Sequence, residues 1–413
     1  MSRKYVMLIP DGMADDPLAE LGGLTPLEAA DTPHMNALAG KGLVGLVRNV
    51  PVGMSPGSDV AVMSVLGFDP ARYHTGRAPL EAPSMGVELE PGQIAYRMNF
   101  VTIANGQMAD FAAGHISSDE AAVLVEDLQS AIGSDEFRFY SGVSYRHLMV
   151  TTDRDLLEMT CTPPHDIIGQ SIKKYLPSGE RADRLLDLMD RSGKILKDHE
   201  INVRRKEAGK KPANRIWLWG QGIRPQMPLF KDVFGMRGAI ISAVPLLQSL
   251  AIFLGLDLVD VDGITGYLDT NYRGKGRAAL EALEKHDFVC IHVEAPDEAG
   301  HSGDWKAKIE AIERIDREVL GTILKGLNHY DKWRILVLPD HPTPVTLRTH
   351  TNEPVPFLMC GNGIDPVGIY KMGESSARAS GIFIDQSHRL IEILFEKQLI
   401  SKNDRHDSKI NNL

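Results

Sequence analysis

Six residues have side chains that suit metal chemistry, and five of them lie in the last third of the sequence. They are three carboxylates and three imidazoles: Asp11, Asp297, His301, Asp340, His341 and His350. Mixed oxygen and nitrogen ligands of this kind suit two divalent cations, each with a coordination position open for substrate. Mn²⁺, Zn²⁺ and Mg²⁺ all fit, and the imidazoles favour Mn²⁺ or Zn²⁺ over Mg²⁺ alone. A single Asp or His is more often a turn residue or a solvated side chain, so the prediction rests on the whole group.

A candidate nucleophile, Ser58, follows a strand-like run at residues 43–50 and opens a helix-like run that ends at Leu66. At a helix N-terminus, the backbone amides and the helix dipole favour a developing phosphoryl oxyanion. A nearby cation would lower the pKa of the hydroxyl enough for it to attack. The alternative is a serine that only caps the helix, and the same spacing describes that role equally well.

Three short apolar runs each end at an acidic residue, and we expect them to be buried parallel strands. The runs are residues 5–10, 288–293 and 334–339. Flanking proline and glycine favour strands over helical segments at these places. In open α/β sheets, ligands bind beyond the carboxyl ends of the strands, which is where the acids would lie.

Helical periodicity fills the intervals between the expected strands, at residues 243–254, 306–325 and 376–397. Alternating strands and helices predict an α/β fold with a doubly wound, mostly parallel sheet. The middle of the chain differs, because hairpin-like runs and a charged stretch there indicate an inserted smaller α+β domain.

The expected domain organisation therefore has three parts. A metal-binding domain is built from residues 1–85 and 223–400, and the inserted domain is residues 86–222. The last residues, 401–413, are polar and indicate a flexible tail without a function of its own.

The composition narrows the class of partner. A net charge of −10 and a pI near 5.8 argue against general binding to nucleic acid or to anionic lipid. The three cysteines, Cys161, Cys290 and Cys360, lack the spacing of a disulfide framework or a thiolate zinc site. Neither a signal peptide nor a membrane-spanning run is evident. We therefore expect a soluble cytoplasmic enzyme with a small-molecule substrate, and the sequence leaves its oligomeric state open.

The motifs resemble those of the alkaline phosphatase superfamily, and within it the archaeal type of cofactor-independent (2,3-bisphosphoglycerate-independent) phosphoglycerate mutases. The resemblance covers nearly the whole chain and is carried by residues 9–15, 56–59, 297–304, 340–341 and 350–356. It implies an alkaline phosphatase-like fold in which the inserted domain holds the substrate.

The resemblance also implies roles for the candidate residues. One cation would be held by Asp297, His301 and His350, and a second by Asp11, Asp340 and His341. Ser58 would be a further ligand of the second cation and would attack a phosphate ester. The resulting phosphoserine would then transfer its phosphoryl group to an acceptor hydroxyl.

The substrate is harder to predict. Archaeal-type mutases carry a lysine between the strand and the metal-binding aspartate, whereas this chain has Glu294 there. An added negative charge works against phosphoglycerate and suits a substrate with an ammonium group. The sequence also resembles a bacterial sister group of proposed homoserine kinases, through residues 111–118, 162–166, 212–222 and 338–344. These features favour phosphorylation of L-homoserine over mutase activity as the prediction, although no nucleotide-binding glycine motif identifies ATP as the donor.

Further residues are candidates for binding the substrate's carboxylate, phosphate or ammonium group. They are Arg97, His115, Arg138, Arg146, His147, His165, Asp166, Arg273, Lys275 and Glu294. Arginine suits bidentate contacts with such anions, but about half of the basic residues would be solvated surface charges instead. Trp217 and Trp219 are more typical of core packing than of ligand stacking.

Three other functions could use the same scaffold. A metal-stabilised binding protein without turnover would be expected to lack Ser58, which is present. A sulfatase needs a modifiable residue followed by Pro and Arg, which residues 58–61 do not supply. A plain phosphatase would hardly need a large insert to exclude water.

Overall fold

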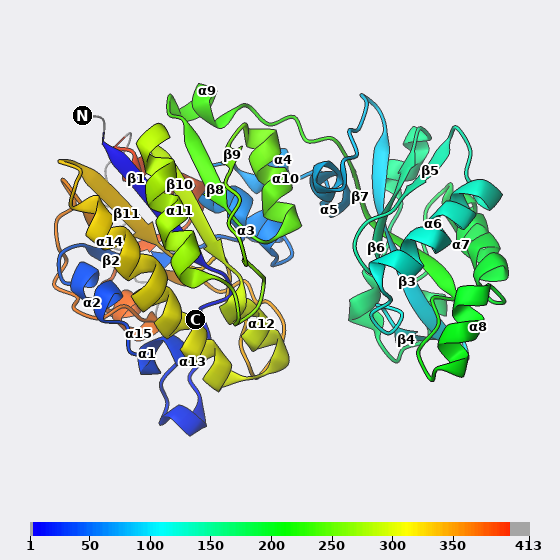
Figure 1. Ribbon diagram of the computed structural model, residues 1–413, viewed down its shortest axis with the longest axis horizontal. Coiled ribbons are helices and arrows are strands. Elements are labelled where there is room, and N and C mark those ends of the chain that lie inside the picture. The colour runs from blue at the N-terminus through cyan, green and yellow to red at the C-terminus, as the bar shows by residue number, and fades with distance from the viewer. Residues whose placement is uncertain (1–2, 397–413) are drawn as a thin grey trace. The chain divides into compact units, whose positions relative to one another are not determined.

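The computed structural model describes residues 3–396, so the tail expected at residues 401–413 lies outside the described residues. The chain divides into two units, which we call the first unit (residues 1–74 and 227–413) and the second unit (residues 75–226). Figure 1 shows the elements of each.

An eight-stranded sheet forms the centre of the first unit, in the order β13-β2-β12-β11-β1-β10-β8-β9. Its strands are β1 (Lys4–Pro10), β2 (Leu43–Val47), β8 (Gly238–Ile241), β9 (Asp257–Leu258), β10 (Phe288–Val293), β11 (Trp333–Val337), β12 (Val355–Gly361) and β13 (Phe383–Ile384). Within this sheet only β12 runs antiparallel to its neighbours. The α/β fold with a mostly parallel sheet, predicted from the sequence, is therefore confirmed.

Helices cover both faces of this sheet. They are η1 (Ala19–Leu21), α1 (Pro26–Ala29), α2 (Pro33–Ala39), α3 (Ser58–Val65), α4 (Pro70–Tyr73), α9 (Phe230–Phe234), α10 (Pro245–Leu254), α11 (Tyr272–Lys285), α12 (Ala295–Ser302), α13 (Trp305–Arg314), the π-helix η6 (Ile315–Leu320), α14 (Gly321–Leu327), α15 (Glu374–Ala379), η7 (Ser387–Arg389) and α16 (Leu390–Leu394). Figure 1 shows α11 and α14 side by side in front of the sheet.

The central strands are buried on both sides, which explains their nearly continuous apolar sequence. Val6 and Leu8 of β1 pack into an aliphatic core with residues of α11 and α14. Tyr5, on the opposite face of β1, joins an aromatic cluster in which its ring centroid lies 4.9 Å from that of Phe395.

The prediction of a single helix at residues 376–397 is wrong, because a strand lies in the middle of this segment. The segment holds α15, then the short strand β13, then η7 and α16. Gly381 adopts φ +68° and interrupts the helix, and β13 then pairs in parallel with β2. Its last residue, Lys397, lies outside the described residues.

The second unit contains an antiparallel sheet built on the long strand β3. The strands are β3 (Ile94–Ala104), β4 (Gln107–Asp110), β5 (Phe137–Tyr140), β6 (Arg146–Thr151) and β7 (Arg215–Ile223). The helices are α5 (Arg77–Glu81), η2 (Ala82–Met85), α6 (Ser118–Ile132), η3 (Arg154–Glu158), η4 (Pro164–Ile167), η5 (Ile172–Lys174), α7 (Ala182–Leu196) and α8 (Glu200–Glu207). Leu124 and Leu185, from α6 and α7, share a buried core with Met98 and Trp217 of the sheet.

Candidate metal centre

Three buried carboxylates meet at the carboxyl ends of three neighbouring strands. Asp11 directly follows β1, Asp340 follows β11, and Asp297 lies in the first turn of α12, which comes after β10. Because β10, β1 and β11 are adjacent and parallel, their ends bring these acids together. Each is at most 5% exposed, and carboxylates so deeply buried require positive partners.

The first set of potential ligands, which we call the open group, consists of Asp297, His301 and His350. Asp297 and His301 share a face of α12 because they are four residues apart. Nε2 of His301 lies 2.8 Å from Nε2 of His350 and 3.3 Å from Oδ2 of Asp297. The side chains of His301 and His350 are 36% and 21% exposed, so this group reaches the surface.

The second set, which we call the buried group, consists of Asp11, Asp340 and His341. Nε2 of His341 lies 3.2 Å from Oδ2 of Asp340 and 3.7 Å from Oδ1 of Asp11. These two oxygens are buried and have no hydrogen-bond partner among the described residues. Buried oxygens without donors are costly, and a divalent cation between them would satisfy both, so the residues fit a metal ion.

The protein holds the other oxygen of Asp340 in place. Its Oδ1 accepts hydrogen bonds from the backbone N–H groups of Gly12 at 3.1 Å and His341 at 2.9 Å. Gly12 has φ +61°, and a Cβ there would lie 2.6 Å from Oδ1 of Asp297. Only glycine therefore fits at this position.

Asp11 and Asp297 are oriented by side chains that the sequence analysis did not select. Nε2 of His292 lies 2.8 Å from Oδ2 of Asp11, and the hydroxyl of Thr343 donates to Oδ1 of Asp297. Oδ1 of Asp11 is thereby left free. The available signal was a polar His292 inside an otherwise apolar strand, which indicates a buried hydrogen bond.

Electrostatics agree with a deficit of positive charge at this centre. Burial, together with the nearby carboxylates of Asp340 and Asp297, raises the pKa of Asp11 well above its ordinary value. At the open group, burial disfavours the imidazolium, but the carboxylate of Asp297 raises the pKa of His301 to about 9. The raised pKa at both places reflects the negative charge of the neighbouring carboxylates, which a cation would offset.

Ser58 lies beside the buried group. Its Oγ is 3.3 Å from Nε2 of His341, and Ser58 is the first residue of α3. The N-cap position belongs to Gly57, and no side chain caps this helix. Ser58 therefore does not cap the helix, which was the alternative that the sequence left open.

Glu294 lies close to the candidate metal ligands. One of its carboxylate oxygens lies within 4.8 Å of ligand oxygens of Asp11 and Asp297. Lys275 is fully buried, and its Nζ donates to the backbone carbonyl of His292 at 2.7 Å. Arg273 is exposed and lines a separate groove between helices.

In the second unit, four of the candidate residues gather around aromatic rings. The guanidinium of Arg97 lies 4.5 Å from the ring centroid of Trp219, which His165 also contacts. The ring of Tyr145 contacts the side chains of His115 and Arg146. Arg97 is also ion-paired with Glu81 of α5 at 2.9 Å.

The remaining candidates in this unit have other surroundings. His147 is 1% exposed, and its Nδ1 accepts from the backbone N–H of Gly142. Burial lowers the pKa of His147 to about 3, so its imidazole is neutral. Asp166 lies 3.6 Å from His165 near the surface, and Arg138 is exposed on β5.

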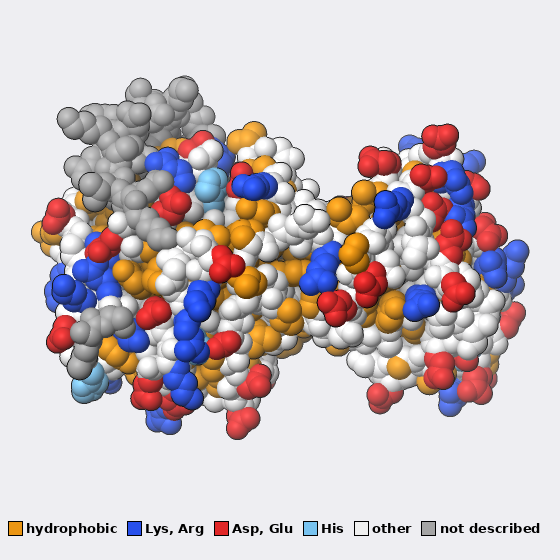
Figure 2. Space-filling model, turned by 90° about the horizontal axis from the view of Figure 1, so that it is seen from above, with side chains coloured by type: hydrophobic (Ala, Val, Ile, Leu, Met, Phe, Trp, Pro, Cys, Tyr) orange, Lys and Arg blue, Asp and Glu red, His pale blue; other side chains and the backbone are white. Residues whose placement is uncertain are grey.

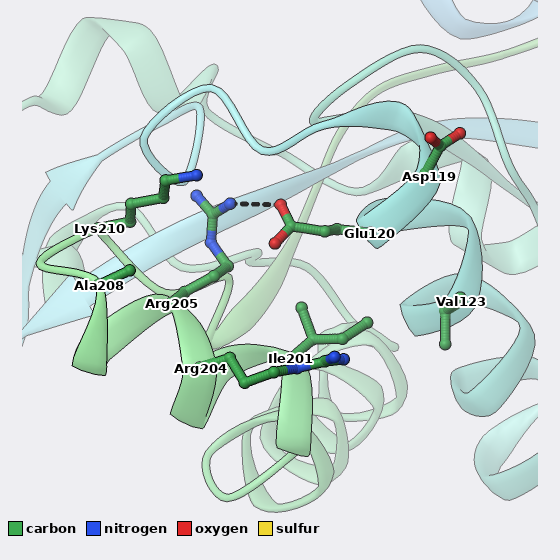
Figure 3. Close-up of a pocket in the computed structure, with 8 residues that line it drawn as sticks. All are labelled: Asp119, Glu120, Val123, Ile201, Arg204, Arg205, Ala208 and Lys210. Carbon is green, nitrogen blue, oxygen red and sulfur yellow. Dashed lines mark hydrogen bonds and ion pairs between the residues drawn. The ribbon is translucent and has the colours of Figure 1, made fainter.

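A mixed-charge pocket of the second unit lies apart from all of these candidates. Figure 3 shows Arg205 of α8 and Glu120 of α6 directed toward one another across it, with an ion pair of 2.6 Å. Figure 2 likewise shows acidic and basic side chains interspersed over one face of the molecule.

Across residues 3–396, every helix is too short or too polar to span a lipid bilayer.

Comparison with known proteins identifies relatives along nearly the whole chain. Residues 39–202 match the family model of 2,3-bisphosphoglycerate-independent phosphoglycerate mutase. A protein of Geobacter sulfurreducens named as a probable mutase of this kind is 51% identical, covering 95% of this chain and 100% of its own. A mutase of Methanothermobacter thermautotrophicus is 50% identical, covering 96% and 98%.

Two solved structures match this chain over nearly its whole length. The cofactor-independent phosphoglycerate mutase of Thermoplasma acidophilum matches with a TM-score of 0.64 and 30% identity, over 96% of this chain and 100% of its own. A protein of Pyrococcus horikoshii matches with a TM-score of 0.81 and 31% identity, over 96% and 97%. The site and these relatives thus define a metal-dependent phosphotransferase. Within that class, the chain belongs to the 2,3-bisphosphoglycerate-independent phosphoglycerate mutase family.

Proposed function

We propose that the chain interconverts 3-phosphoglycerate and 2-phosphoglycerate through a phosphoserine formed on Ser58. One observation carries the proposal: Oγ of Ser58 lies 3.3 Å from Nε2 of His341. His341 belongs to the buried group, in which two carboxylate oxygens have no hydrogen-bond partner among the described residues. The relatives named as mutases, about half identical over nearly their whole length, support this activity. The relatives lend no support to L-homoserine and ATP as substrates, which the sequence favoured.

Beside the resemblance to the bacterial sister group, the argument for homoserine rested on Glu294 as a charge that repels an anionic substrate. In the structure its carboxylate lies close to Asp11 and Asp297, and the ammonium group of Lys275 is a favourable neighbour. Glu294 thus lies among the candidate ligands, where a bound cation would offset its charge. The reason to prefer an ammonium-bearing substrate no longer holds.

Two divalent cations would be held at the centre, one by the open group and one by the buried group. When bound, they would lower the pKa of the Ser58 hydroxyl and offset the negative charge of the phosphoryl group. The three imidazoles favour Mn²⁺ or Zn²⁺.

Ser58 would act as a temporary phosphoryl acceptor. Its Oγ, having lost its proton, attacks the phosphorus of 3-phosphoglycerate; the bond between phosphorus and the C3 oxygen breaks, and that oxygen takes up a proton. The C2 hydroxyl of the same glycerate then loses its proton and attacks the phosphoserine, which restores Ser58. The position of Ser58 at the start of α3 favours the negative charge of the phosphoryl group during both steps.

We place this reaction in the cytoplasm. Cys161, Cys290 and Cys360 are all free thiols, and burial raises the pKa of Cys290. Such inert thiols are typical of a reducing compartment.

A paired assay on metal-loaded protein tests the proposal. Conversion of 3-phosphoglycerate to 2-phosphoglycerate is measured beside ATP-dependent phosphorylation of L-homoserine. We expect turnover with phosphoglycerate alone, and turnover with homoserine alone would overturn the proposal.

The phosphoserine is tested with the variant Ser58→Ala. Removal of the acceptor oxygen should abolish mutase turnover, a loss of at least about 10⁴-fold, and leave the bound metal largely in place. The matched control is Ser55→Ala, an exposed serine three residues earlier, which should turn over normally. Near-normal turnover of Ser58→Ala would contradict the phosphoserine.

A further inference from the structure

A basic groove lies between helices of the first unit, and no residue of it belongs to the open or the buried group. It has a volume of about 580 Å³. Its cationic side chains are Arg273 and Arg277 of α11, Arg317 of η6 and Lys325 of α14. No carboxylate is among its lining residues, so the groove presents four positive charges on a chain whose net charge is −10.

The cations of the groove have little internal compensation. Within residues 3–396, no carboxylate forms an ion pair with Arg273, Arg277 or Lys325. The nearest compensation is Glu318, which lies 3.8 Å from Arg317 and is also engaged by Arg314 at 3.2 Å. An anion from solution would therefore meet guanidinium and ammonium groups that are free to bind it.

The placement of the two arginines on α11 is unfavourable without an anion. Arg273 stands in the first turn of α11, where no acidic residue is present and the helix dipole disfavours a cation. Arg277 follows four residues later on the same helix face, so the two like charges repel each other. A bound anion would relieve both effects.

The floor of the groove results from close helix packing. A Cβ on Gly326 would lie 2.4 Å from Leu280, and one on Gly276 would lie 3.0 Å from Thr322. These glycines let α14 and α11 approach closely. The intervening π-helix η6 adds a residue per turn where Arg317 lies, and such segments occur frequently at functional sites.

We propose that this groove binds a small metabolite that carries two or more phosphate groups. Four cations on three elements exceed what one phosphate group can contact, whereas two phosphate groups can each engage a pair of them. The volume lies in the usual range for small-molecule sites. An extended polyanion such as nucleic acid would be repelled by the rest of an acidic chain.

Titration calorimetry on the metal-loaded, full-length protein tests the proposal, with fructose 1,6-bisphosphate as the probe and inorganic phosphate for comparison. The double variant Arg277→Gln and Lys325→Gln removes two cations that have no ion pair to lose. We expect it to raise the Kd for the bisphosphate at least about tenfold, without a change in mutase turnover when the probe is absent. Binding of the probe at the metal centre would persist in this variant and is thereby distinguished.

The matched control is Lys194→Gln with Lys197→Gln, which removes two exposed charges near the end of α7 that have no ion pair within the described residues. It should leave the Kd unchanged. The proposal is overturned if wild-type protein does not bind the bisphosphate at physiological ionic strength, if the groove variant binds it as tightly as wild type, or if the control loses as much affinity. Equal affinity for inorganic phosphate would overturn the requirement for two phosphate groups. Because mutase turnover is measured separately, these outcomes do not depend on the proposed function.

Discussion

The two ligand groups are built from similar residues but differ in their access to solvent. The buried group has side chains at most 1% exposed, whereas the histidines of the open group are 21% and 36% exposed. In the open group, the side chains of His301 and His350 reach solvent and can be hydrated when no metal is bound. In the buried group, two carboxylate oxygens have no hydrogen-bond partner among the described residues. The buried group should therefore depend more strongly on its cation, and the following variants test that difference.

The largest effect is expected from Asp340→Asn in the buried group. Replacement of the carboxylate by an amide weakens a candidate metal ligand, Oδ2, which lies 3.2 Å from Nε2 of His341. Mutase turnover should therefore fall by about 1,000-fold or more. Elemental analysis should find less metal per chain. The control is Asp365→Asn in an exposed loop, which should be indistinguishable from wild type.

His350→Gln should have a smaller effect, because the open group keeps two ligands and solvent can enter. We expect metal affinity at this group to fall about 100-fold and turnover to recover at high metal concentration. Calorimetric titration with Mn²⁺ measures both groups. A loss of turnover as large as that of Asp340→Asn, without recovery, would contradict the proposed difference between the groups.

His292→Phe tests the side chain that orients Asp11. Without the donor at Oδ2, Asp11 is free to rotate, and metal affinity at the buried group should fall about 10- to 100-fold. His292→Gln places an amide N–H near the same oxygen and should restore much of the affinity. Equal affinity in both variants would mean that His292 acts only by filling space.

The smallest effect concerns Glu374, a buried carboxylate that lies outside both groups. Its oxygens accept from the hydroxyl of Thr25 and the backbone N–H of Asp15, so it needs no cation. Burial raises its pKa to about 7 from the ordinary 4.5, so the folded protein binds this proton more tightly than the unfolded chain. The free energy of unfolding should therefore decrease from pH 4.5 to 7, by at most about 3 kcal/mol.

Glu374→Gln should remove this decrease. Denaturant unfolding of wild type and variant, followed across that pH range, measures the difference, since other titrating groups cancel between them. A constant difference between the two proteins would show that Glu374 ionises normally.

Much of the site could be predicted because its ligands lie next to strong strand signals. The runs before Asp11 and Asp340, and the spacing of Asp297 and His301, required only short-range patterns. The hydrogen bonds of His292 and Thr343 could not be predicted, because they depend on the register between strands that are distant in sequence. In the same way, pairing of β13 with β2 overrode the helical periodicity of residues 376–397.

The antiparallel strand β12 causes one loop to contribute residues to both ligand groups. Because β12 runs antiparallel to β11, the connection between them leaves and returns at the same edge of the sheet. This one loop supplies Asp340 and His341 to the buried group and His350 to the open group. Occupation of either group fixes the loop and reduces the conformational entropy that the second cation must overcome, so the two binding equilibria should be thermodynamically linked, with positive cooperativity.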